Sequence, residues 1–139
     1  MSRKDLRHEF AELLKIELGD LVSAVYSGQV ADFAKARSVV VISSAGSVPR
    51  IVGAGNYQGV HQVAVDIFVL YADAETDWDE EDAEDLLDEI NQKVMDTLEK
   101  HPTGKNWTAL DWTDPSQTMP IVDLGGTEYR REQIILQPS

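Results

Sequence analysis

Residues 60–100 constrain the fold of this chain most strongly, because they have the pattern of one strand followed by one long helix. The strand is indicated by apolar or aromatic residues at every second position: Val63, Val65, Ile67, Val69 and Tyr71. The helix is indicated by apolar residues at helical spacing: Ala83, Leu86, Leu87, Ile90, Val94 and Leu98. We expect the helix to end at His101-Pro102, because the residue before a proline disfavours helical geometry.

The flanking segments predict a second helix and further strands. Residues 2–21 place leucines and Phe10 on one helical face, with Ser2 in position to cap the helix. Strands are predicted at residues 38–44, 107–112, 120–124 and 127–137. We therefore expect one α+β domain over residues 1–139. Its mixed, mainly antiparallel β-sheet should carry an N-terminal helix and one long amphipathic helix packed on one face.

Three segments leave alternatives open. Residues 21–26 fit either a strand or a continued helix, and residues 29–37 fit one helical turn or two. Residues 45–59 contain four glycines and Pro49, but also apolar residues. A stretch of this length is either an arm that docks on a neighbouring subunit or a two-stranded hairpin that closes on its own domain.

The second face of the central strand carries Phe68 and Leu70 beside Asp66. The long helix can cover only one face of the sheet, so the other face needs either more of this chain or a partner. We expect this face to be open near Phe68 and to contact another subunit.

Charge and composition exclude several classes of partner. Twelve cations against 25 anions give a net charge of −13, which opposes specific nucleic-acid binding and attachment to an anionic membrane. The charge is uneven: residues 1–50 hold seven cations and six anions, whereas residues 51–139 hold five and nineteen. The chain has no cysteine, and its charged start lacks an apolar signal core, so we expect it to fold in a cytoplasm.

The acidic run at residues 73–89 has one feature of a calcium site. Asp77, Asp79 and Glu81 have the alternate-residue spacing of an EF-hand loop. However, Asp82 stands where the sharp-turn glycine of that loop belongs, and no short helix leads into the run. A solvated helix start is therefore the preferred interpretation, and we expect no metal ion or cofactor.

The remaining residues give no catalytic pattern. The three histidines, His8, His61 and His101, are far apart in sequence, and no serine lies in a Gly-x-Ser-x-Gly elbow. Gly53-Ala54-Gly55 is not followed by the lysine of a nucleotide-binding loop. We therefore expect that the chain is not an enzyme.

The order of elements resembles that of tail terminator (tail completion) proteins of long-tailed bacteriophages and of related phage neck and minor tail proteins. The matching elements are a leading helix, a short segment ending in Ser27-Gly28, the strand 39–42, a long glycine-rich connection, the strand 61–72, an amphipathic helix and the closing strand 129–136. The resemblance covers about residues 10–137.

This resemblance implies a structural virion protein, made in the host cytoplasm, that forms a ring, usually hexameric, at the end of the tail tube. The ring stops polymerisation of the tube protein and joins the tube to the head–tail connector, while DNA passes through without specific binding. The candidate subunit-interface residues are Arg50, Ile51, Val52, Tyr57, Phe68 and Leu70. The alternatives are another neck or minor tail protein, or a small acidic module unrelated to phage, which in its most specific form binds calcium.

Overall fold

The protein is described by a computed structural model that covers residues 2–51, 57–112 and 116–139. The helical elements are α1 (Arg3–Leu18), η1 (Gly19–Leu21), η2 (Ala74–Thr76) and α2 (Glu80–Lys100). The strands are β1 (Ala24–Ser27), β2 (Ser38–Ile51), β3 (Tyr57–Leu70), β4 (Leu110–Trp112), β5 (Gln117–Leu124) and β6 (Thr127–Pro138). The predicted α+β class is confirmed. Within the described residues, no helix is both long and apolar enough to cross a membrane.

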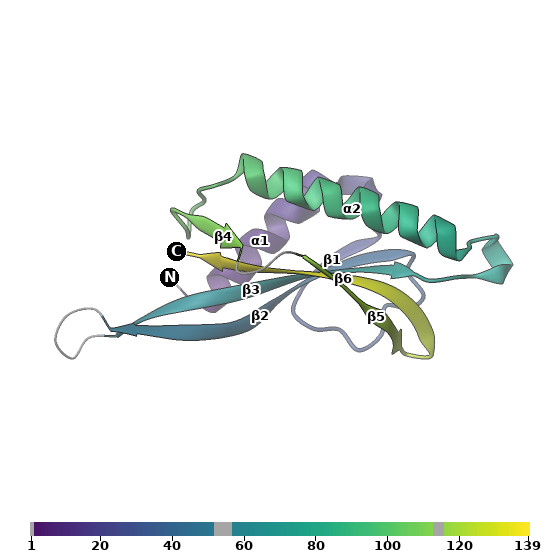
Figure 1. The fold of residues 1–139 in the computed structure, drawn as a ribbon, viewed down its shortest axis with the longest axis horizontal. Coiled ribbons are helices and arrows are strands. Elements are labelled where there is room, and N and C mark those ends of the chain that lie inside the picture. Colours follow the sequence, from purple (N-terminus) through teal and green to yellow (C-terminus); the bar gives the residue numbers. More distant parts are fainter. Residues whose placement is uncertain (1, 52–56, 113–115) are drawn as a thin grey trace.

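The strands form one mixed sheet with β3 near its centre. Its order is β1-β2-β3-β6-β4, and β5 pairs with the same strand, β6, as β4 does. Only β1 and β2 are parallel, and the other pairs are antiparallel. Figure 1 shows α1 and α2 on one side of this sheet, and the connection between β1 and β2 on the other side.

The helix-covered face holds the larger core. Leu6, Phe10 and Leu14 of α1 are fully buried in this core, as are Leu87 and Ile90 of α2. Ser2 caps α1 as predicted, since its hydroxyl accepts a hydrogen bond from the Asp5 amide at 3.1 Å. The long helix ends at His101 as predicted. Its start is fixed by a capping box between Asp79 and Asp82, which the sequence analysis did not predict.

The opposite face holds a second, smaller core. The irregular segment 28–37 crosses this face and places the ring of Phe33 5.0 Å from that of Phe68 and 5.3 Å from that of Tyr129. Tyr129 also donates a hydrogen bond to the carbonyl of Ala36 at 3.2 Å. The segment is anchored by its aromatic side chain and has no regular secondary structure, although one or two helical turns were predicted there.

Candidate subunit interface

The β2–β3 hairpin continues past the strands that flank it. We define the arm as residues 47–51 and 57–61 of this hairpin, beyond the bulge in β2. Strand β1 pairs with β2 only as far as Ile42, and β6 pairs with β3 only from Val63 onward. The two strands of the arm stay paired with each other as far as Ile51 and Tyr57. In the described part of the chain, no strand pairs with either outer edge of the arm, which projects from the body of the molecule (Figure 1).

A bulge and a cross-strand hydrogen bond mark the base of the arm. The pairing register shifts between Ser44 and Gly46, and Gly46 has a φ of 136°, which a residue with a side chain rarely adopts. Beside it, the Ser47 hydroxyl lies 2.8 Å from His61 Nδ1 on the opposite strand. Because bulges increase local twist, this one sets the direction of the arm.

The two outer edges of the sheet differ in how well they resist pairing with another chain. On the β5 side, the register is interrupted between Met119 and Val122, with Pro120 in the interruption, and both features discourage strand addition. The β2 side also has a register shift, between Ser44 and Gly46, but its residues 43–47 are Ser-Ser-Ala-Gly-Ser, with no charge and no proline. The stretch of β2 that leads into the arm therefore lacks the proline that protects the β5 edge.

The structure distributes the predicted interface residues between the arm and the core. Arg50, Ile51 and Tyr57 lie on the arm strands, and Val52 falls outside the described residues. Residues 45–51 and 57–59 thus belong to a two-stranded hairpin, but in Figure 1 it projects from the domain and does not close on it, as one of the two alternatives had it. Docking of this hairpin on a neighbour stays a prediction.

The expectation that the sheet face is open at Phe68 is wrong for the single chain. Phe68 and Leu70 are 5% and 6% exposed, because Phe33 and Tyr129 pack with them in the second core. The covering layer comes from residues 28–37 and from Val122 and Leu124 of β5. These side chains therefore offer almost no surface to a partner in this conformation.

A buried carboxylate lies where this covered region ends. Asp66 is 1% exposed, and one of its oxygens, Oδ1, accepts hydrogen bonds from Arg131 Nε at 3.0 Å and Gln133 Nε2 at 3.1 Å. A nitrogen of the Arg131 guanidinium, Nη2, lies 2.9 Å from the same oxygen. Burial raises the pKa of Asp66 above its ordinary value of 3.8, although the Arg131 charge and the hydrogen bonds act to lower it. The arrangement fixes β3 against β6 on the face away from the helices.

The sequence analysis named Asp66 but not its partners. The signal was an aspartate within an otherwise apolar central strand, since a buried charge requires a counter-charge or hydrogen bonds. Tyr129, Arg131 and Gln133 are alternate residues of β6, so the period of a strand puts them on one face, which is the face they occupy. Only the register of β3 against β6, which the sequence does not specify, brings them opposite Asp66.

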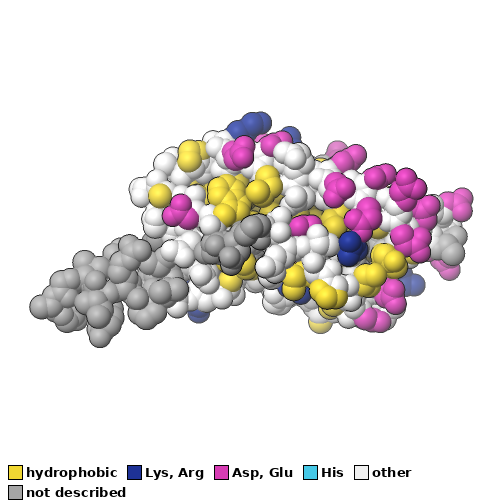
Figure 2. All heavy atoms as spheres, viewed as in Figure 1, with side chains coloured by type: hydrophobic (Ala, Val, Ile, Leu, Met, Phe, Trp, Pro, Cys, Tyr) yellow, Lys and Arg dark blue, Asp and Glu magenta, His cyan; other side chains and the backbone are white. Residues whose placement is uncertain are grey.

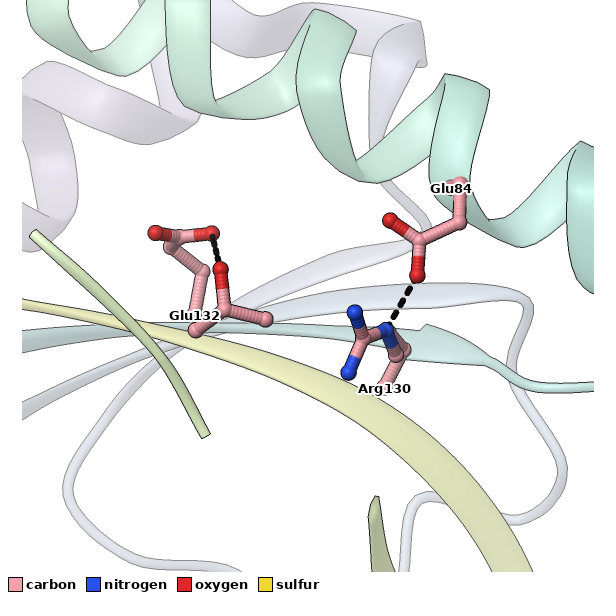
Figure 3. Close-up of polar contacts among 4 residues, drawn as sticks. Glu84, Arg130 and Glu132 are labelled. Atoms are coloured by element: carbon pink, nitrogen blue, oxygen red, sulfur yellow. Dashed lines mark hydrogen bonds and ion pairs between the residues drawn. The ribbon is translucent and has the colours of Figure 1, made fainter. Parts of the chain in front are cut away.

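Eleven of the 25 acidic residues lie between Asp73 and Glu89, at the end of the molecule remote from the arm. Figure 2 shows them over the region where α2 begins. One of them, Glu84, forms an ion pair with Arg130 of β6 (Figure 3), which fastens the first turns of α2 to the sheet. Nearby, the buried Glu132 accepts a hydrogen bond from the Thr118 hydroxyl at 3.0 Å, which links β5 to β6.

Of the three residues with calcium-loop spacing, Asp79 has another partner. Its carboxylate accepts the Asp82 N–H in the capping box of α2, and the Asp82 carboxylate accepts the Asp79 N–H in return. Within residues 2–51, 57–112 and 116–139, no three histidine, aspartate or glutamate side chains are grouped so that they could hold a metal ion. The acidic run thus has a structural role at the start of the helix.

Comparison of the chain with protein-family models and with curated proteins found no match.

Proposed function

We propose that this chain is a structural subunit that assembles with copies of itself into a ring at the end of a bacteriophage tail tube. In this role it terminates tube polymerisation and provides the joint to the head–tail connector. The observation that carries the proposal is the arm, a paired hairpin whose outer edges have no strand partner in the described chain. An exposed edge of this kind is a template for contact with another polypeptide.

The distribution of charge supports self-assembly through the arm. Two copies that each carry a net charge of −13 repel one another unless their contact lies away from the acidic side chains. Their densest group, residues 73–89, lies at the far end from the arm (Figures 1 and 2), so a contact at the arm keeps this acidic end of that copy out of the interface. A closed ring further requires a heterologous contact, in which one surface meets a different surface on the next copy.

Mass photometry and negative-stain microscopy of the purified protein, alone and with assembled tail tubes, test the proposal. We expect closed rings at high concentration or on the tube ends, and capped tubes that no longer elongate. A protein that stays monomeric at every concentration and leaves tube growth unchanged would contradict the proposed function.

A further inference from the structure

The face of the sheet opposite the helices is not covered along its whole length. The second core covers it from Asp66 toward Leu70, but the part that leads into the arm carries a set of uncharged residues, all of them half-buried except Ala64, which is 3% exposed. We call this set the uncharged strip; it consists of Ser43, Gly46, Gln62, Ala64, Gln133, Ile135 and Gln137. Neither core cluster of the described residues includes any of them.

Strand pairing places these residues side by side on one face. Ala64 lies opposite Ser43 on β2 and opposite Ile135 on β6, and Gln62 lies opposite Gly46. Gly46 adds no side chain, so the surface is low at that point. In Figure 1 the segment 28–37 and β5 lie on this side of the sheet, toward the end where α2 begins. The strip therefore lies between that covering layer and the arm.

The strip lacks unpaired charge in a strongly anionic protein. None of its seven members is charged. Two carboxylates border the strip: Asp66 is paired with Arg131, whereas the exposed Asp111 of β4 lies opposite Gln137. Depletion of charged residues is the compositional mark of the centre of a protein–protein interface. Electrostatic repulsion between two anionic copies is weakest when they meet at such a surface.

The size of the strip shows that it cannot be a whole interface. Strands are about 4.8 Å apart and residues about 3.4 Å apart, so three strands over four residue steps cover roughly 200 Å². A stable contact buries about 800 Å² on each partner. Two strips packed face to face would fall well short of this area, so a larger element must lie on the strip.

We propose that the uncharged strip receives the arm of a neighbouring copy, so that arm and strip are the two halves of one heterologous contact. This inference rests on the proposed function and names the receiving surface that a ring requires. The arm supplies the missing area and an unpaired strand edge. Because each copy carries both halves, every arm can occupy the strip of the next copy until the ring closes.

A pair of matched isoleucine substitutions tests the position of the contact. Ile135→Lys places a charge in the strip, whereas Ile121→Lys places the same charge on β5, where Ile121 is 42% exposed. We expect Ile135→Lys to shift the concentration for half-assembly upward at least tenfold in mass photometry, and Ile121→Lys to assemble as the wild type does. If Ile121→Lys blocks assembly and Ile135→Lys does not, the contact lies at β5 and the inference is overturned.

Mixing two defective variants tests whether the contact is heterologous. Ile135→Lys retains its arm, and Arg50→Glu, on the arm, retains its strip. Each should be monomeric alone, but an equimolar mixture should form 1:1 dimers and nothing larger, because one intact arm and one intact strip remain. A mixture that stays monomeric would overturn the inference. Should Ile135→Lys lose its cooperative thermal unfolding, Gln62→Glu replaces it as the strip variant.

Failure of this inference and failure of the proposed function give different results. If wild-type rings form but every strip variant also forms them, the receiving surface is elsewhere and the ring proposal stands. If the wild type never assembles, with or without tail tubes, both are overturned.

Discussion

Removing the Phe33 side chain should destabilise the protein strongly, although this residue lies in a segment without regular secondary structure. Phe33 is only 4% exposed and packs its ring against Phe68 and Tyr129, with the ring of Tyr26 6.2 Å away. Phenylalanine-to-alanine changes in protein cores cost about 3–5 kcal/mol. The segment 28–37 can partly collapse into the space, so we expect Phe33→Ala to cost about 3 kcal/mol.

The assay is urea unfolding of Phe33→Ala and the wild type at equal protein concentration, followed by circular dichroism. A loss of about 3 kcal/mol is a large fraction of the 5–15 kcal/mol typical of a domain, and for this size should lower Tm by roughly 10 °C. Ile16→Ala is the control: Ile16 is 75% exposed on α1, and its truncation should change stability by less than about 0.5 kcal/mol.

A small effect of Phe33→Ala would refute this account of the second face. If the variant lost less than about 1 kcal/mol, the segment 28–37 would not be packed on the sheet in solution. Phe68 and Leu70 would then be accessible, as the sequence analysis expected, and would return as candidates for the subunit interface. The experiment thus decides between a covered and an open face at these two residues.

Three further predictions concern the core, the buried carboxylate and the arm. Ile90→Asp should abolish cooperative unfolding in circular dichroism, because it places a charge in the fully buried helix face; a folded, soluble variant would contradict the position of Ile90. Because burial raises the pKa of Asp66, the folded state binds this proton more tightly than the unfolded state does. The protonated Asp66 carboxyl therefore stabilises the folded state below pH 3.8, and this contribution is lost as the pH rises through the folded-state pKa. The free energy of unfolding of Asp66→Asn, measured by urea titration relative to the wild type, should increase as the pH rises through that pKa. A free-energy difference that does not change with pH would contradict the raised pKa. Arg50→Glu should leave thermal unfolding unchanged but reduce ring formation in mass photometry, and normal rings would remove the arm from the interface.

Elements with a periodic pattern were predictable from the sequence, and the segment 28–37 was not. The helix α2 follows from its apolar spacing and from the proline after His101. In contrast, Ala34 and Lys35 have φ values of 52° and 59°, which residues with side chains adopt rarely and which no pattern signals. The Asp32 carboxylate accepts the Ala34 amide at 2.8 Å and stabilises this local turn, while packing of Phe33 places the segment on the sheet.

Strand ends were predicted too short where glycine or proline occurs within a strand. The strand β2 was predicted to end at Ser44, but it continues through Gly46 and Pro49 to Ile51. Likewise β5 begins at Gln117 rather than at Pro120. In both strands the pairing register shifts near these residues, and a bulge lets a strand pass an irregularity without ending.

On the sheet face opposite the helices, the residues at alternate positions of β3 decide where the second core ends and where the uncovered surface begins. Phe68 and Leu70 are large and apolar, so the chain gains stability by folding residues 28–37 over them. Ala64 is too small to anchor such a layer, and Asp66 between them holds its charge with partners from β6. The covering layer therefore ends at Asp66, and the same strand that forms the core on one side of this residue forms the uncharged strip and the arm on the other.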